Sequence, residues 1–179
     1  MKKLTILLLI MGLFNWSGLF GQKKAESDSK VDINKPIENP ELKKAFETFR
    51  NKKTEENLMT VINGFLKANF LVLAITDEME TSKSGTNNVV VEKGGLIKFL
   101  NCFDQDDKPF LPLFTDWQEV DLWLKNRDMN TSGFVMNTFE AFEFAKNDTF
   151  YNGIVINSGS NAWTMSKEKI GNFLEEYKK

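Results

Sequence analysis

The stretch from Leu96 to Asn126, LIKFLNCFDQDDKPFLPLFTDWQEVDLWLKN, constrains the fold more than any other part of the chain. Apolar residues dominate 96–103, polar turn-forming residues occupy 104–108, and a second apolar run begins at Phe110. This pattern predicts a hairpin whose strands carry apolar side chains on both faces, as in a sheet covered by helices. Because Pro112 has no backbone N–H, the second strand is expected at a sheet edge or with this position facing away from a partner.

A helix is predicted directly after the hairpin. Residues Thr115-Asp116-Trp117-Gln118 fit a capping box, in which the Thr115 hydroxyl and the Gln118 side chain satisfy free amides at the helix start. Apolar side chains then recur at helical spacing. They are Trp117, Val120, Trp123 and Leu124.

The other elements alternate between helices and strands. Helix starts are predicted where a capping residue precedes an apolar period, at Asn39, Thr54, Asn137 or Thr138, and Ser166. Strands are predicted where short apolar runs lie between polar residues, at Phe70–Ile75, Val89–Val91, Gly133–Asn137 and Gly153–Ile156. The sequence therefore predicts an α/β (α+β) fold, a single-domain mixed β-sheet of about five strands including one hairpin, flanked by helices.

The start of the chain has the pattern of a secretory signal peptide. Lys2 and Lys3 precede the apolar run Leu4–Leu13, which is short for a membrane span. We expect a signal peptide at 1–21, a flexible polar linker at 22–38 and the folded domain at 39–179, with an uncleaved anchor as the alternative. The protein is then exported, periplasmic or secreted, in a bacterial host, with no membrane span after signal removal.

Charge and composition exclude several classes of function. The chain carries 23 Lys+Arg against 25 Asp+Glu, without the basic stripe that nucleic-acid binding requires, so no nucleic acid is expected as a partner. It contains no histidine, which removes the commonest general base and the usual zinc ligand. Asp104, Asp106 and Asp107 lie close together, but Lys108 and Pro109 break the calcium-loop pattern. No metal and no cofactor are expected.

Two nucleophile candidates have simpler structural explanations. Cys102, the single cysteine, lies among apolar neighbours, where a buried inert thiol is favoured over a nucleophile or a bond between chains. Ser166 and Lys169 have the S-x-x-K spacing of penicillin-recognising enzymes. The companion motifs are absent, and the serine is explained as a helix cap. No catalytic residue is assigned.

The second half of the chain resembles the amino-terminal domain of the SseB family. The similarity rests on the run Phe110–Asp116, the strand ending at Asn137, the strand and asparagine at Gly153–Asn157, and the helix beginning at Ser166, and it extends from about Leu58 onward. Ser158 stands where the family usually has proline, and the leader is a second departure. The resemblance implies an α/β domain without a defined biochemical activity.

Polar residues follow several predicted strands, and strand ends are where open sheets tend to bind ligands. The pairs are Thr76-Asp77, Thr115-Asp116, Asn137-Thr138 and Asn157-Ser158. Capping and turn formation explain each pair individually. The candidate binding residues are Thr115, Asp116, Asn137 and Asn157.

The leading hypothesis is an exported non-enzymatic binding module for a protein or small ligand. The alternative is a histidine-free hydrolase using paired carboxylates, drawn from Asp77, Glu78, Asp106 or Asp116.

Overall fold

The computed structural model describes residues 37–75, 81–83, 89–91, 97–125, 127 and 129–178. The predicted signal peptide, nearly all of the predicted linker, and Thr76, Asp77 and Glu78 lie outside these residues. Within them, the helices are α1 (Pro40–Asn51), α2 (Glu55–Phe65), α3 (Trp117–Leu124), α4 (Thr138–Asn147) and α5 (Lys167–Tyr177). The strands are β1 (Asn69–Ile75), β2 (Thr81–Lys83), β3 (Val89–Val91), β4 (Cys102–Phe103), β5 (Pro109–Leu113), β6 (Thr131–Asn137), β7 (Gly153–Ile156) and β8 (Trp163–Ser166).

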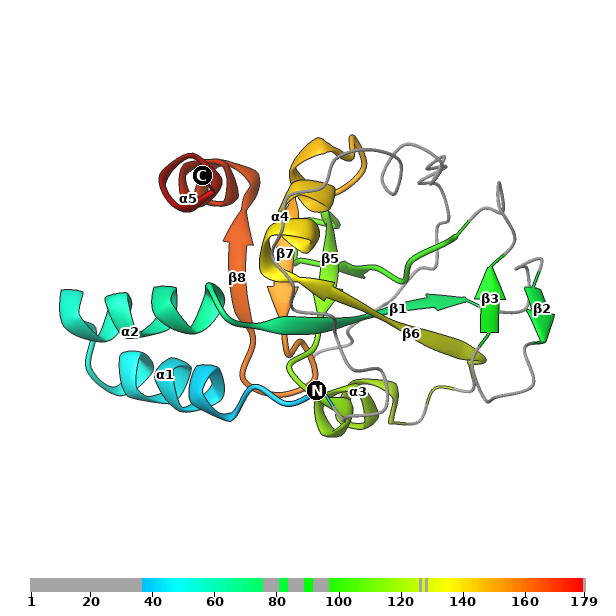
Figure 1. Ribbon diagram of the computed structural model, residues 1–179, viewed down its shortest axis with the longest axis horizontal. Helices are drawn as coiled ribbons and strands as arrows, with labels where there is room; N and C mark the ends of the chain where they lie inside the picture. Colours follow the sequence, from blue (N-terminus) through cyan, green and yellow to red (C-terminus); the bar gives the residue numbers. More distant parts are fainter. Residues whose placement is uncertain are drawn as a thin grey trace.

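The strands form a mixed arrangement (Figure 1). One sheet has the order β4-β5-β7-β8, in which β5 and β7 are parallel and the other neighbours antiparallel. A second sheet pairs β1 with β6, and β2 pairs with β3, both antiparallel. Bridges from Leu71 to Phe114 and from Ala74 to Phe99 join β1 to the chain around β5 and β4. The predicted mixed α/β fold with one hairpin is therefore confirmed.

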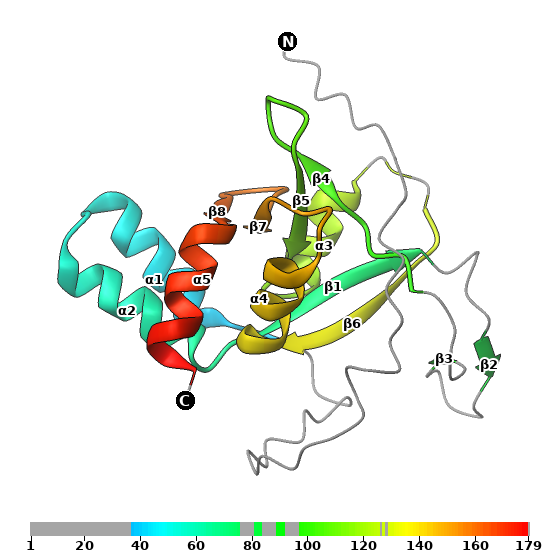
Figure 2. The ribbon, with the colours of Figure 1, turned by 90° about the horizontal axis from the view of Figure 1, so that it is seen from above.

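Strand β1 is buried on both faces, as the apolar run predicted. Phe70 and Val72 belong to the larger hydrophobic core, together with residues of α1, α2, α4 and α5. Leu71 and Leu73 belong to a smaller core with Val120 and Trp123 of α3. Figures 1 and 2 show α4 on one side of β1 and α3 on the other. The alternation of side chains along one strand thus produces the two cores.

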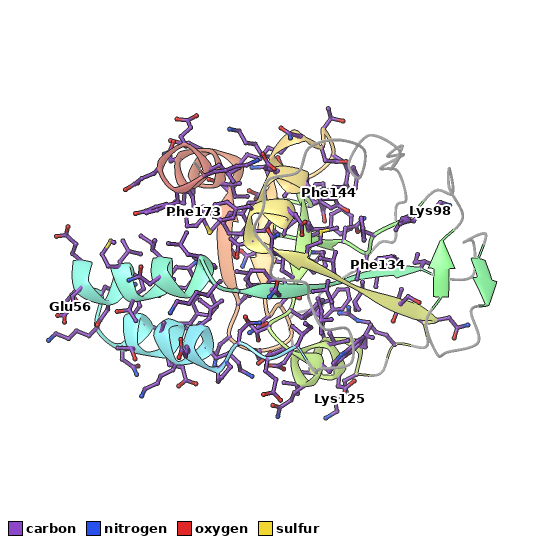
Figure 3. The ribbon with its side chains drawn as sticks, in the orientation of Figure 1. Glu56, Lys98, Lys125, Phe134, Phe144 and Phe173 are labelled. Atoms are coloured by element: carbon purple, nitrogen blue, oxygen red, sulfur yellow. The ribbon has the colours of Figure 1, made fainter. Side chains whose placement is uncertain are left out.

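Aromatic rings fill much of the larger core. Phe65 at the end of α2 lies against Phe142 of α4 and Phe173 of α5, with ring centroids 5.6 and 5.9 Å apart. Figure 3 shows Phe173 pointing from α5 toward α2. Because such rings bury large apolar areas and favour edge contacts, they hold helices from both ends of the sequence on the same side of the sheet.

The first hairpin strand is shorter than predicted. Only Cys102 and Phe103 pair with β5, while Phe99 makes an isolated bridge to Ala74 of β1. The chain before Cys102 therefore turns toward β1 instead of continuing along β5. Pro112 has no partner on the β4 side, because β4 ends opposite Pro109 and Phe110, and its missing N–H costs no ladder hydrogen bond.

Strand β8 was not predicted, because Trp163–Ser166 is short and runs directly into α5. The predicted cap at Ser166 is nevertheless confirmed, as are those at Thr54 and Asn137. No helix in the described ranges is both long and apolar enough for a membrane crossing.

Candidate functional site

The ends of the parallel strands β5 and β7 bring Thr115 and Asn157 together. The Asn157 side-chain oxygen accepts a hydrogen bond from the Thr115 backbone N–H at 3.0 Å, and its Nδ2 donates to the Thr115 hydroxyl at 3.0 Å. Both residues are buried. Asn157 has a φ of 56°, a left-handed conformation that asparagine tolerates better than most residues. The pair fixes how the chain leaves the two strands.

Asp116, and not Thr115, caps α3. Asp116 Oδ1 accepts a hydrogen bond from the Glu119 N–H at 2.9 Å, and the helix begins at Trp117. The predicted capping box of Thr115 and Gln118 is therefore wrong. Its threonine is held by Asn157, and the helix starts one residue later than the box requires.

Lys43 connects α1 to the start of α3. Its Nζ lies 2.9 Å from Asp116 Oδ2 and 3.2 Å from Glu119 Oε1. The Glu119 side chain is buried and also accepts a hydrogen bond from the Ser160 hydroxyl in the loop after β7. One lysine thus ties together two carboxylates and, through Glu119, a third segment of the chain.

This network shifts the pKa values of two members away from neutrality. Burial raises the pKa of Asp116, but hydrogen bonds from Lys43 and from the Glu119 N–H outweigh burial and lower the pKa below its ordinary value. Burial lowers the pKa of Lys43, while its bonds to the two carboxylates outweigh burial and raise it. Asp116 and Lys43 are therefore both charged at neutral pH.

Asn39 performs a different task from the predicted one. Its side chain does not cap α1. Instead, Nδ2 donates to the backbone carbonyls of Asn69 and Thr115, both at 2.7 Å. Asn39 thereby joins the start of α1 to the start of β1 and to the segment after β5.

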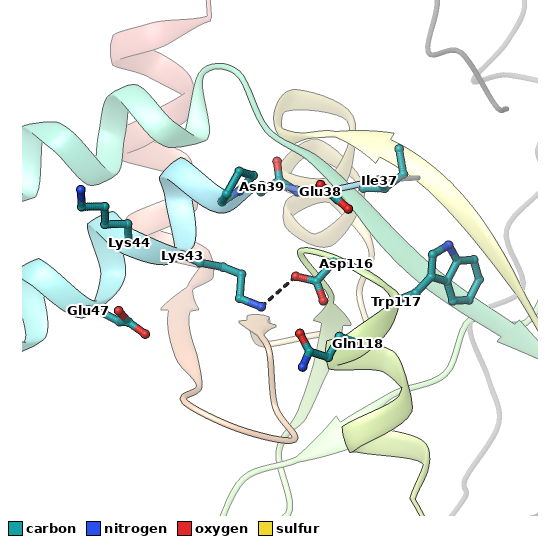
Figure 4. Close-up of a pocket in the computed structure, with 10 residues that line it drawn as sticks. Ile37, Glu38, Asn39, Lys43, Lys44, Glu47, Asp116, Trp117 and Gln118 are labelled. Atoms are coloured by element: carbon teal, nitrogen blue, oxygen red, sulfur yellow. Dashed lines mark hydrogen bonds and ion pairs between the residues drawn. The ribbon is translucent and has the colours of Figure 1, made fainter. Parts of the chain in front are cut away.

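A groove of about 460 Å³ lies between the starts of α1 and α3 (Figure 4). The residues lining it are Ile37, Glu38, Asn39, Pro40, Lys43, Lys44, Glu47, Asp116, Trp117 and Gln118. Figure 4 shows the Lys43–Asp116 contact between the two helices. The Trp117 ring lies against Gly133 of β6, where a Cβ would be 2.6 Å from its Cη2 atom. An aromatic surface and an ion pair therefore share one open groove.

Asn137 stands apart from the other three candidate residues. Its side chain accepts the Glu140 N–H at 3.0 Å, and the Glu140 carboxylate accepts the Asn137 N–H at 2.9 Å, completing a capping box. Because β1 lies between Asn137 and the chain at Phe114, the separation is two strand spacings, about 10 Å. The structure brings Thr115, Asp116 and Asn157 together and leaves Asn137 as a cap. A role in binding stays a prediction for all four.

Sequence reasoning missed Asn39, Lys43 and Glu119 as members of this cluster. Asn39 and Thr115 are 76 positions apart, and no local pattern connects them. The spacing of Asp116 and Glu119 was the available signal, because residues three apart lie on one helix face.

The remaining candidates have structural roles. Burial raises the pKa of Cys102 to about 12, so its thiol stays neutral. The Ser166 hydroxyl accepts the Lys169 N–H at 3.4 Å as a helix cap. Asp104 Oδ1 accepts N–H groups of Asp106 and Lys108, both at 2.9 Å, and so closes the turn. In the ranges that the structure covers, no group of three or more His, Cys, Asp or Glu residues is placed to hold a metal ion.

Comparison with curated proteins and with solved structures gave no match. The family described as SseB protein N-terminal domain matches residues 42–171. The match begins earlier than Leu58, where the resemblance was expected to start, and it takes in Lys43 and most of α1. Because it covers well over half of the sequence, the chain belongs to the SseB family.

Proposed function

We propose that the protein is an exported, non-enzymatic binding module that holds a segment of another protein in the groove between α1 and α3. The observation that carries this proposal is Trp117, which lines the groove with 46% of its surface exposed beside the Lys43–Asp116 pair. Exposed tryptophan is costly in water and is enriched among the residues that dominate protein interfaces.

The lining of the groove suits a polypeptide better than a compact small molecule. Ile37, Pro40 and Trp117 offer apolar contact, while Lys44 and Glu47 offer charges of both signs along α1. An open groove of this mixed character matches a chain that presents apolar and charged side chains in turn. A small ligand in the same groove is the other outcome that the experiment below distinguishes.

The chemistry of Asp116 supports binding over catalysis. A general acid needs a proton near neutral pH, and the ion pair with Lys43 lowers the pKa of Asp116 instead. Asp106 and Asp116 lie beyond opposite ends of β5, a strand that spans roughly 16 Å, too far for a glycosidase carboxylate pair. Asp116 and Glu119 do converge on Lys43, but Glu119 is buried and is not among the residues that line the groove, so the alternative hydrolase would have Asp116 alone facing a substrate there.

A photo-activated cross-linking residue placed at position 118 tests the proposal. Gln118 is exposed and lines the groove, whereas Leu122 lies on the same helix, is 45% exposed and does not line the groove. With extracts of exported proteins from the native host, position 118 is expected to give a discrete protein adduct and position 122 none. Trp117→Ala should abolish the adduct, and Leu122→Ala should retain it.

Three outcomes contradict the proposal. The same adducts from positions 118 and 122 would indicate non-specific contact. An adduct that survives Trp117→Ala would place the partner elsewhere. A small-molecule adduct at position 118 would show that the groove binds a small ligand and not a protein segment.

A further inference from the structure

The four-stranded sheet has two faces with different coverings. Leu111 and Ile154 face the larger core beneath α4 and α5, so their neighbours Phe110 and Val155 face the opposite side. The α3 helix lines a pocket on this opposite side through Trp123. The face of the sheet that carries Phe110 and Val155 is only partly covered, and the pocket lies there.

This pocket has a volume of about 220 Å³ and lies apart from the α1–α3 groove, with which it shares no lining residue. Phe110, Val155 and Trp123 form apolar walls, and Cys102 adds a neutral thiol. Of the described residues that line the pocket, Asp104 is the charged one; it is exposed, and its carboxylate oxygen closes the hairpin turn. Among the described residues that line the pocket, none carries a buried charge, and the nearby Arg127 guanidinium already lies over the Trp123 ring, 4.2 Å from its centroid. A neutral ligand therefore suits this lining better than a charged one.

One residue that lines the pocket has a buried polar atom without a hydrogen-bond partner among the described residues. Ser158 lines the pocket, and its hydroxyl oxygen is buried without a hydrogen-bond partner among the described residues. Such groups are rare in folded proteins, because each forfeits the hydrogen bond that water would provide. Rotation about the serine Cα–Cβ bond moves the hydroxyl between staggered positions, so a ligand in the pocket can supply the missing partner.

We propose that this pocket binds a small, neutral ring compound carrying one hydrogen-bonding group, of the size of phenol or indole, with the group on Ser158. A cavity of roughly 150 Å³ is known to hold benzene, so a volume of about 220 Å³ accommodates one substituted or fused ring. Aromatic and aliphatic walls contact the ring, and the serine fixes its orientation. This binding is separate from the proposed capture of a protein segment in the groove.

The test compares phenol with toluene, two probes of similar shape that differ in a hydroxyl and a methyl group. Each is titrated into the folded protein while backbone amide signals are followed by nuclear magnetic resonance. Phenol is expected to shift signals of residues 102–104, 155, 158 and 162–164 and to bind about fivefold more tightly than toluene, the gain expected from one hydrogen bond. Ser158→Ala should remove this preference without weakening toluene binding.

Thr164→Trp provides a second, independent variant, because Thr164 is an exposed residue of β8 that lines the pocket. With a native amide spectrum, it should fill the pocket and abolish binding of both probes. Three results overturn the proposal: no shifts at the solubility limit of phenol, shifts confined to the α1–α3 groove, or a phenol preference that persists in Ser158→Ala.

Discussion

Asn157 combines two demands that few residues meet. Its backbone is left-handed at a φ of 56°, and its buried side chain both accepts from and donates to Thr115. Asparagine tolerates this backbone region, and its amide supplies a donor and an acceptor on one short side chain. The junction between β5, β7 and α3 therefore depends on this residue type.

Substituting Asn157 separates the two contributions. Asn157→Gly removes the side-chain hydrogen bonds while permitting the backbone conformation, and we expect it to lower the free energy of unfolding by about 1–3 kcal/mol. Asn157→Ala loses the same bonds and adds backbone strain, at a further cost of about 1 kcal/mol. Denaturant unfolding of the three proteins measures both effects. Equal stability of the two variants would show that the left-handed conformation carries no strain.

The charge of Asp116 makes stability depend on pH. Its folded pKa lies below the ordinary value of 3.8, so the stability that this carboxylate contributes is present above that value and is lost as pH falls through the folded pKa. Asp116→Asn keeps a capping side chain but removes the charge that pairs with Lys43. Unfolding midpoints measured downward from neutral pH should fall less steeply below about pH 4 in the variant. Parallel curves would mean that the ion pair contributes nothing to folding.

Element boundaries show what local sequence can and cannot determine. The caps at Thr54, Asn137 and Ser166 were predicted correctly, because a cap depends on residues within one helical turn. Thr115 and Asn39 have equally suitable side chains, yet both bond to distant segments instead. These two side chains form tertiary hydrogen bonds instead of capping a helix. No local sequence pattern distinguishes a side chain that caps a helix from one that bonds to a distant segment.

The missed strand β8 has the same kind of cause. Its first residue, Trp163, stacks on Phe46 of α1 with ring centroids 4.7 Å apart. A run of four residues pairing with β7 carries little periodicity of its own, so the neighbouring elements define it. Strand β2 (Thr81–Lys83) was missed as well, because it contains no apolar residue. The helices and the strands with a continuous apolar run, such as β1 and β7, were predicted.

Substitution of Asn137 tests whether the cap of α4 contributes to binding in the groove. Asn137→Ala removes the capping box of α4 and should destabilise the domain by about 1 kcal/mol. Because the Asn137 side chain, among the described residues, accepts its hydrogen bond from Glu140 in the same helix start, cross-linking from position 118 should be unchanged. Loss of the adduct in a folded Asn137→Ala protein would show that Asn137 contributes to binding in the groove.

For the whole protein, the predicted order is a leader at 1–21, a tether at 22–38 and a domain from 39 onward. The motivation is Lys2 and Lys3 before the apolar run Leu4–Leu13. Mass measurement of protein from the native host should give a mature amino terminus at Gln22. Retention of Met1 on a protein found in the cytoplasm would exclude export.

The family and general architecture of the molecule were accessible from the sequence, whereas the groove was not. The Phe110–Asp116 run and the strand patterns sufficed for the SseB assignment, which the match over residues 42–171 confirms. The groove instead requires residues of α1 to meet the start of α3, and only the packing of the sheet determines that meeting. Composition limited the chemistry, since a chain without histidine lacks the commonest catalytic base.

The approach of the chain to α1 has a practical consequence for anyone who handles this protein. Ile37, Glu38 and Asn39 form part of the groove wall before the first helix begins. A purification tag joined directly in front of residue 37, in place of the residues before it, would therefore start at the groove itself. The described chain ends after α5, none of whose residues lines the groove. Affinity tags and surface-attachment handles for binding measurements consequently belong at the carboxyl end.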